Sequence, residues 1–335
     1  MERIALYVGL DYHQGSVQVC VMDEEGRVVA NRKCVNHWRA ISRAVARHGE
    51  QVHAALEACA GAAELAEELT GRAGWSVALA HPGYVARMRQ SPDKTDFSDA
   101  RMLADLVRVG YLPRVWLPPR EVRELRRLVR YRQQLVGEGR AAKLRLLAVL
   151  REQRVSSAPG LRRWGRPWLR WLGEGAPLSA QGRWVVQRHL ARLGALGAER
   201  RLVEERLGSL TAGDPVVEKL LRLPGVGPVT AWTLRAEVGR FERFRSGKQL
   251  SRFCGLSPRN ASSGARQADS GLIRAGNPQL RGVLIEAAHR LIRWEPRWRC
   301  LALTLRAAGK PGSVVAAAVA NRWMRWLYHQ MQNAA

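Results

Sequence analysis

The last two thirds of the sequence are poor in carboxylates. Residues 1–119 hold 14 basic and 14 acidic side chains, whereas residues 120–335 hold 41 basic and only 15 acidic ones. The net charge of +26 therefore belongs entirely to residues 120–335. Lysine is also scarce, with six against 49 arginines; codon bias explains Arg in place of Lys but not the missing carboxylates. A one-sided positive charge favours a polyanionic partner, since Lys and Arg replace the counterions of nucleic-acid phosphates.

Paired cysteines and long apolar runs are absent from the sequence. The five cysteines are scattered and never spaced as C-x-x-C, which argues against a disulfide framework or a structural zinc site and predicts reduced, mostly buried thiols. No apolar run reaches the roughly 18 residues that cross a bilayer, and Asp11 interrupts any signal-like segment. We therefore expect a cytoplasmic protein without a membrane partner. With 46% hydrophobic residues and 12 Trp, the chain can bury the cores of two or more domains.

The neutral first segment alternates short strands and helices. The patterns predict strands at 4–11, 17–22, 28–32, 52–56 and 76–80, and helices at 38–48, 62–72 and 96–109. Three antiparallel strands followed by alternating helices and strands predict an α/β domain with a mixed sheet. This order matches an RNase H-like fold.

Four carboxylates of this segment occupy positions that suit metal binding. Asp11 ends the first strand and Glu57 ends the fourth, where ligands of an open sheet usually lie. Asp96 and Asp99 share one face near the start of a predicted helix. Paired Mg²⁺ ions need several converging oxygen ligands and can promote phosphodiester transfer. Either helix aspartate alone could instead cap the helix, and Glu57 could be an ordinary polar residue.

Three stretches of this segment resemble the RuvC-like domain of the DEDD transposases of the insertion sequence 110 family, the RNA-guided bridge recombinases. They are Val8-Gly9-Leu10-Asp11, then Leu56-Glu57-Ala58 with Gly61 beyond, and Lys94-Thr95-Asp96-Phe97-Ser98-Asp99-Ala100-Arg101. The Lys-Thr-Asp-x-x-Asp-Ala run is the most specific of them. The resemblance implies that Asp11, Glu57, Asp96 and Asp99 are the metal-binding carboxylates.

The middle of the chain, residues 119–212, reads as two long helices. Apolar residues recur along one stripe over 121–150 and again over about 178–210, so the helices could pair as an antiparallel coiled coil within or between chains. Between them, Trp164, Trp168 and Trp171 alternate with arginines that include Arg163 and Arg166. The spacing of the tryptophans favours the apolar stripe of a short helix over a role in base stacking. The arginines are interpreted as nucleic-acid contacts. In the resembled family this region assembles subunits and helps to hold the bridge RNA.

Residues 213–335 are predicted to form a mostly helical C-terminal domain. Residues 221–234 read as a helix-hairpin-helix, in which Gly225 and Gly227 permit a tight turn facing a phosphate; a plain helix-helix turn is the alternative. The last segment, 283–332, reads as helices whose tryptophans (Trp294, Trp298, Trp323 and Trp326) are expected in the core and in interfaces.

A second family pattern lies in this domain. Gly255-Leu256-Ser257-Pro258, then Ser263-Gly264, then Gly276-Asn277-Pro278-Gln279-Leu280-Arg281 resemble the second signature domain of the same transposases, with Arg274 where the family usually has Lys. There, the serine before the glycine forms a covalent phosphoserine link to DNA. The resemblance points to Ser263, with Ser262 adjacent as the alternative. The phosphate-binding candidates are Arg259, Arg266, Arg274 and Arg281.

The sequence thus predicts an RuvC-like domain at 1–118, a helical coiled-coil region at 119–212 and a C-terminal transposase domain at 213–335. The resemblance implies a Mg²⁺-assisted DNA recombinase of a mobile element, guided by a structured RNA and working as a dimer or tetramer in a bacterial or archaeal nucleoid. Two other hypotheses remain: a junction-resolving or RNase H-type nuclease that uses water, and a non-catalytic nucleic-acid-binding protein.

Overall fold

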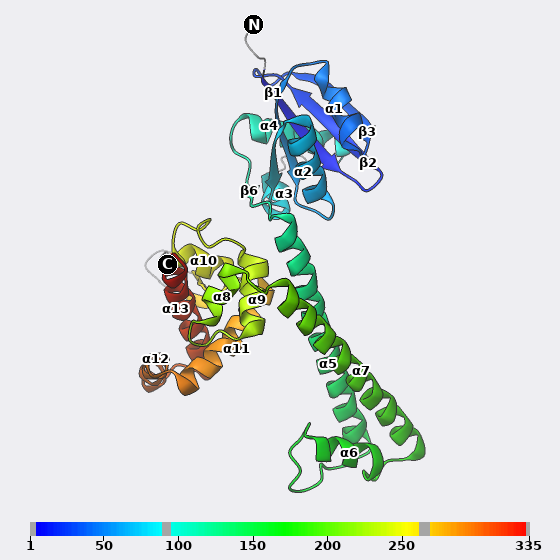
Figure 1. The fold of residues 1–335 in the computed structure, drawn as a ribbon, viewed down its shortest axis with the longest axis vertical. Coiled ribbons are helices and arrows are strands. Elements are labelled where there is room, and N and C mark those ends of the chain that lie inside the picture. The colour runs from blue at the N-terminus through cyan, green and yellow to red at the C-terminus, as the bar shows by residue number, and fades with distance from the viewer. Residues whose placement is uncertain (1–4, 89–94, 261–268, 333–335) are drawn as a thin grey trace. The chain divides into compact units, whose positions relative to one another are not determined.

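A computed structural model describes residues 5–88, 95–260 and 269–332. The chain divides into two compact units, Met1–Pro119 and Arg120–Ala335 (Figure 1).

The first unit is built on one mixed sheet of six strands. The strands are β1 (Ala5–Tyr12), β2 (Ser16–Met22), β3 (Val28–Val35), β4 (Gln51–Glu57), β5 (Ser76–Ala80) and β6 (Arg114–Val115), in the order β3-β2-β1-β4-β5-β6. β1 runs antiparallel to β2 and parallel to β4, β4 runs parallel to β5, and β6 is antiparallel to β5. The predicted α/β class and mixed sheet are confirmed.

Helices cover both faces of this sheet. The even-numbered residues Leu6, Val8 and Leu10 of β1 share a core with buried residues of α1 (Trp38–Ala46) and α2 (Ala62–Ala73). On the opposite face, Tyr7 packs beside α4 (Asp96–Arg108). The short helix α3 (Pro82–Met88) follows β5. Because successive strand residues point to opposite faces, the odd-numbered positions of β1, including Asp11, belong to the face that carries α4.

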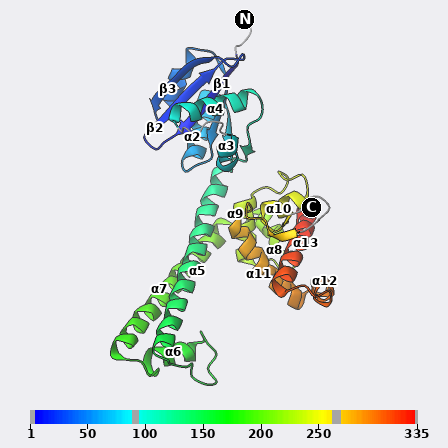
Figure 2. The ribbon, with the colours of Figure 1, turned by 180° about the vertical axis from the view of Figure 1, so that it is seen from behind.

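The second unit begins with a pair of long helices, which lie side by side in Figures 1 and 2. α5 (Arg120–Glu152) and α7 (Ala180–Leu210) are antiparallel, because Arg132 pairs with Glu204 at 2.7 Å while Glu138 pairs with Arg192 at 3.3 Å. Within one chain, therefore, the predicted antiparallel pairing is confirmed. α6 (Arg166–Glu174) follows α5, with Trp168 fully buried and Trp164 and Trp171 packed around it. The apolar-stripe interpretation is confirmed for Trp168 and Trp171, whereas Trp164 packs on the same cluster from just before the helix.

The remaining helices surround a single hydrophobic core. They are α8 (Pro215–Leu221), α9 (Pro228–Val238), α10 (Gly247–Phe253), α11 (Pro278–Trp294), α12 (Pro296–Ala307) and α13 (Gly312–Gln332). Between α10 and α11, β7 (Pro258–Asn260) and β8 (Asp269–Leu272) form a two-stranded antiparallel sheet. The part of the second unit that follows α7 is therefore mostly helical, as predicted.

One sequence-based prediction needs correction, and another is met in part. Of the five cysteines, Cys20 and Cys254 are buried, whereas Cys59 and Cys300 are exposed, so the thiols are free but not mostly buried. Of the tryptophans expected in the core and in interfaces, Trp298 and Trp323 are core residues, whereas Trp294 is 80% exposed and lies outside the core. Within the described residues, no helix combines the length and the apolar character that crossing a bilayer requires.

Candidate active site

The end of β1 and the first turns of α4 meet at a contact that only glycine permits. A Cβ on Gly9 would overlap the carbonyl oxygen of Ala100 and lie 2.5 Å from the backbone nitrogen of Ala104. The backbone of α4 therefore rests directly on β1 at this position. Asp11 lies two residues further along the strand, on the same face, and the first turn of α4 carries Asp96 and Asp99.

Glu57 reaches the same region from the neighbouring strand. β1 and β4 are parallel, and Leu10 pairs with Leu56. The next residues of the two strands, Asp11 and Glu57, therefore lie beside one another at the carboxyl ends of these strands. Ala55, two residues before Glu57, packs with Leu103 of α4. Glu57 therefore belongs to the face of the sheet that carries α4.

The start of α4 is fixed without using either aspartate. Thr95 is the N-cap: its Oγ1 accepts a hydrogen bond from the backbone N–H of Ser98 at 3.1 Å, and Ser98 Oγ accepts from the N–H of Thr95 at 3.2 Å. Asn31 of β3 also donates to the carbonyl oxygen of Phe97 at 3.1 Å. The alternative interpretation of Asp96 or Asp99 as the helix cap is therefore wrong.

His13 joins two members of the cluster. Its Nε2 lies 3.2 Å from Asp11 Oδ2 and 3.3 Å from Asp96 Oδ1. The chain after Asp11 is held in place, because the N–H of His13 donates to the carbonyl oxygen of Ser16 and Asn36 donates to that of His13. One imidazole thus bridges carboxylates that come from β1 and from α4.

The electrostatics of the cluster favour a cation. Burial raises the pKa of Asp11 above its usual value; His13 opposes this shift, while the negative charges of Asp96 and Asp99 add to it. Burial likewise raises the pKa of the Cys59 thiol, and the charges of Glu57 and Asp11 contribute to that shift. All four carboxylates therefore contribute negative charge near the carboxyl ends of β1 and β4. A positive ion bound among them would reduce their mutual repulsion.

The donor set fits a divalent metal ion. Asp11, His13 and Asp96 each offer a ligand atom, and these atoms lie within 4.8 Å of one another. Asp99 is 6% exposed, which is unusual for a carboxylate unless a positive charge or a set of donors compensates its burial. Carboxylate oxygens suit Mg²⁺ and Mn²⁺, and an added imidazole suits Mn²⁺ better than Mg²⁺.

In the second unit, α8 and α9 are joined by a tight turn. Gly225 has a φ of +83°, in the left-handed region, and a Cβ there would lie 2.6 Å from Leu291 of α11. Gly227 is the N-cap of α9 and Pro228 its first helical residue, so the helix begins with backbone N–H groups that its own turns do not use. A turn between two helices therefore lies within residues 221–234, as both the helix-hairpin-helix prediction and its plain-turn alternative require.

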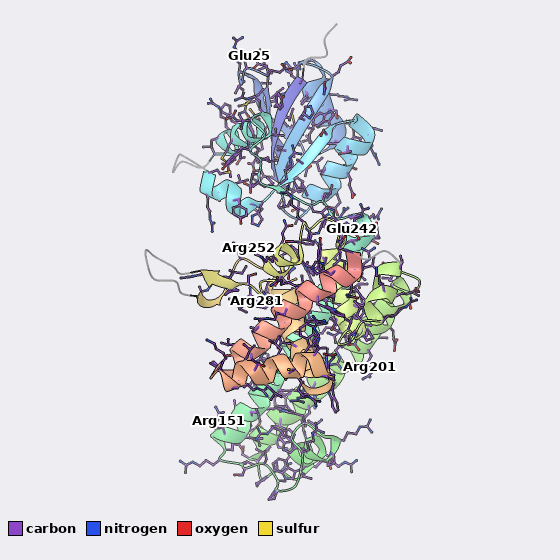
Figure 3. The ribbon with its side chains drawn as sticks, turned by 90° about the vertical axis from the view of Figure 1, so that its left-hand side faces the viewer. Glu25, Arg151, Arg201, Glu242, Arg252 and Arg281 are labelled. Atoms are coloured by element: carbon purple, nitrogen blue, oxygen red, sulfur yellow. The ribbon has the colours of Figure 1, made fainter. Side chains whose placement is uncertain are left out.

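The predicted nucleophile Ser263 and the neighbouring Arg266 lie outside the described residues, between β7 and β8. The base of that segment is tightly built. The side chain of Arg281 donates to the carbonyl oxygen of Ile273 at 2.9 Å, and a Cβ on Gly255 would lie 2.5 Å from the same guanidinium group. The N–H of Asn277 donates to the carbonyl oxygen of Phe253 at 2.9 Å. Arg281, labelled in Figure 3, therefore supports this base from α11.

Comparison with known proteins identifies the family. A model of DEDD transposases of the IS110 type, described as "Transposase", matches residues 8–154, and a model described as "Transposase IS116/IS110/IS902 family" matches residues 217–302. The first match spans Asp11, Glu57, Asp96 and Asp99, and the second spans the α8–α9 turn and the β7–β8 segment. The chain belongs to the IS110 family of transposases.

Two relatives agree with this assignment over most of their length. The IS110 transposase chain is 29% identical to a "Probable family 20 transposase" of Pseudomonas aeruginosa over 96% of its own length and 95% of the relative's. It is 28% identical to the "Transposase for insertion sequence element IS1111A" of Coxiella burnetii, over 85% and 78% of the two chains. A transposase of this family binds DNA and carries out its cleavage and strand transfer, and a DEDD family uses divalent metal.

Sequence reasoning about this transposase missed His13. The signal was present, since Asp-Tyr-His places a second metal-ligating side chain two residues beyond Asp11. Of the predicted nucleic-acid contacts, Arg163, Arg166, Arg259 and Arg274 are exposed. Arg281 is half-buried and engaged with the backbone.

Proposed function

We propose that this transposase is an RNA-guided DNA recombinase whose first 118 residues form an RuvC-like, RNase H-type domain. The observation that carries the proposal is the convergence of Asp11, Asp96 and Asp99 with His13 at the end of β1, beside Glu57 on β4. The sheet order and the position of α4 on the face of Asp11 agree with that fold.

In this proposal Asp11, Glu57, Asp96 and Asp99 hold Mg²⁺, and His13 adds a nitrogen donor next to Asp11 and Asp96. Bound divalent ions supply Lewis-acid stabilisation of the charge that develops on phosphate oxygens. The residues of the chain orient the ion: the Thr95–Ser98 box and Asn31 fix the first turn of α4, and Gly9 lets that helix approach β1.

Ser263 is the proposed nucleophile, with Ser262 as the alternative. Its hydroxyl oxygen forms a bond to the scissile phosphorus and loses its proton, the bond to the leaving sugar oxygen breaks, and that oxygen gains a proton. One phosphodiester is exchanged for another, so strand exchange needs no external energy source. The support for this step is the family match over residues 217–302. The hydrogen bond of Asn277 to Phe253 joins described residues on either side of the β7–β8 connection in the chain, and that of Arg281 to Ile273 lies just after it.

The basic second unit is proposed to hold DNA and a structured bridge RNA. The α8–α9 turn is interpreted as a helix-hairpin-helix, with Gly225 and Gly227 facing a phosphate. Exposed Arg163 and Arg166 are proposed RNA contacts, and Arg259, Arg266, Arg274 and Arg281 are proposed contacts to the scissile phosphate. Dimers or tetramers of the chain would act on the chromosome of a bacterium or archaeon, within the nucleoid.

A trapping experiment tests the serine step. The full chain is incubated with element-end DNA, the bridge RNA and Mg²⁺, and protein-linked DNA is resolved on a denaturing gel. Wild type and Ser262→Ala are expected to give a covalent band that Ser263→Ala lacks. Nicked DNA without a covalent band in all three proteins would instead support a nuclease that uses water.

A second experiment tests the metal site. Asp11→Asn is expected to abolish cleavage while retaining DNA binding in a gel-shift assay, and to weaken Mn²⁺ binding measured by calorimetry. Glu25→Gln, a change at an acidic residue of the β2–β3 turn, is the matched control. Full cleavage by Asp11→Asn would support a non-catalytic role for the carboxylates.

A further inference from the structure

One tryptophan in the C-terminal domain is largely exposed to solvent. Trp294 is 80% exposed, more than any other large hydrophobic side chain that the structure describes. It is the last residue of α11, whereas Trp298 and Trp326 lie in or against the core. Exposing an indole ring forgoes its burial energy, which is about 25 cal/mol for each Å² of apolar surface.

Trp294 lies at a hollow beside the α8–α9 turn. The hollow is lined by the turn residues 224–230 together with Arg290, Leu291, Trp294 and Glu295. Gly225 packs on Leu291, which is 2% exposed, so the turn and α11 are fixed relative to one another. Arg290 and Trp294 are one helical turn apart and therefore lie next to each other on α11.

The charge around the hollow is positive. Arg290, in the lining, and Arg293, three residues further along α11, are exposed. The carboxylate of Glu295 is engaged at the N-terminus of α12, where its Oε2 accepts the N–H of Trp298 at 3.1 Å. An accessible aromatic face next to guanidinium groups matches an unpaired nucleotide, which offers a flat base and a phosphate together.

We propose that this hollow binds one unpaired nucleotide, with its base stacked on Trp294 and its phosphate held by Arg290. The inference rests on the nucleic-acid binding of the proposed function but not on the serine chemistry. It assigns to the α8–α9 turn a second task besides contact with a phosphate: the turn forms one wall of a base-binding site whose opposite wall is the indole.

Binding of labelled single strands to the full chain tests this site by fluorescence anisotropy. Trp294→Ala is expected to raise the Kd for a 20-nucleotide DNA about tenfold, or about 1.4 kcal/mol, within the range for a stacked base. Trp294→Phe retains most of the affinity, because phenyl also stacks. Trp184→Ala is the matched control: Trp184 is 60% exposed but lies on α7.

Oligonucleotides with abasic sites separate stacking from charge. On a fully abasic strand, wild type and Trp294→Ala are expected to bind equally, while Arg290→Ala weakens binding to both strands. An RNA of the same sequence, run in parallel, shows which nucleic acid the hollow prefers.

Equal affinity of wild type and Trp294→Ala for the normal strand would overturn the proposal. So would a Trp294→Ala protein whose only change is its oligomeric state in sedimentation, since the indole would then be a protein contact. The trapping experiment with Ser263→Ala is independent: absence of the covalent band in wild type would reject the serine mechanism and leave the nucleotide site untouched.

Discussion

Replacing Gly9 with alanine should separate the two halves of the metal site. The added methyl group would overlap the carbonyl oxygen of Ala100 and lie 2.5 Å from the nitrogen of Ala104, both in the backbone of α4. Ordinary contact needs about 3.5 Å, so α4 must move away from β1 by about 1 Å or more. Asp96 and Asp99 move with it, while Asp11 stays on β1.

The expected loss follows from that displacement. A misplacement of about 1 Å at a catalytic group can cost about 100-fold in rate, and overpacking of this kind destabilises a fold by about 1–3 kcal/mol. Gly9→Ala should therefore remain folded at 25 °C by circular dichroism, bind Mn²⁺ more weakly in calorimetry, and cleave DNA about 100-fold more slowly at saturating Mg²⁺.

Gly71→Ala is the matched control. Gly71 lies in α2, and a Cβ there meets no atom within 4 Å, so the change should leave activity intact and stabilise the helix by up to about 1 kcal/mol. Wild-type metal affinity and cleavage in Gly9→Ala would refute the argument that the approach of α4 to β1 sets the geometry of the carboxylates.

Two further predictions concern the stability and the thiols of the protein. Glu237 is 2% exposed and accepts hydrogen bonds from Arg130 at 2.8 and 3.1 Å and from Asn277 at 2.9 Å. Its replacement by alanine should lower the free energy of unfolding, measured by urea denaturation, by about 3 kcal/mol. Alanine at exposed Glu242, the control, should lower it by less than about 0.5 kcal/mol. Burial raises the pKa of Cys20 to about 11 and that of Cys254 still further, so at about pH 8 a thiol reagent should modify exposed Cys300 and leave these two intact until the chain is unfolded. Rapid modification of Cys20 or Cys254 in the folded state, or an unchanged urea midpoint for Glu237→Ala, would contradict the burial on which each prediction depends.

The carboxylate site was predictable because each part of it has a local signal. Asp11 and Glu57 end strands whose buried runs are visible in the sequence, and the Thr95–Ser98 box marks the start of α4. What the sequence does not contain is the register that aligns Leu10 with Leu56, or the contact of α4 with Gly9. Those depend on packing between distant segments, so the convergence could be expected only from the match of the element order to an RNase H-like fold.

Other elements carried weak or misleading signals. β6 has two residues and α3 begins at Pro82-Gly83, which reads as a turn; β7 and β8 are short and flank a Ser-rich stretch. For Trp294, helical periodicity was misleading. It follows buried Leu291 by three residues and so falls near the apolar stripe of α11, but the helix ends there and the chain turns into α12.

The antiparallel helices α5 and α7 form an arm that ends at α6. Because the two helices run side by side, the length of this arm can be changed by matched changes in both. The C-terminal domain is attached at the beginning of α5, where Arg126 donates to the carbonyl oxygen of Ala236 and Arg130 binds Glu237. Segments of equal length could therefore be removed from both helices beyond Arg132 without touching that attachment, each residue shortening the arm by about 1.5 Å. The length of the α5–α7 pair therefore sets the distance between α6 and the C-terminal domain, and matched deletions or insertions in the two helices would change that distance.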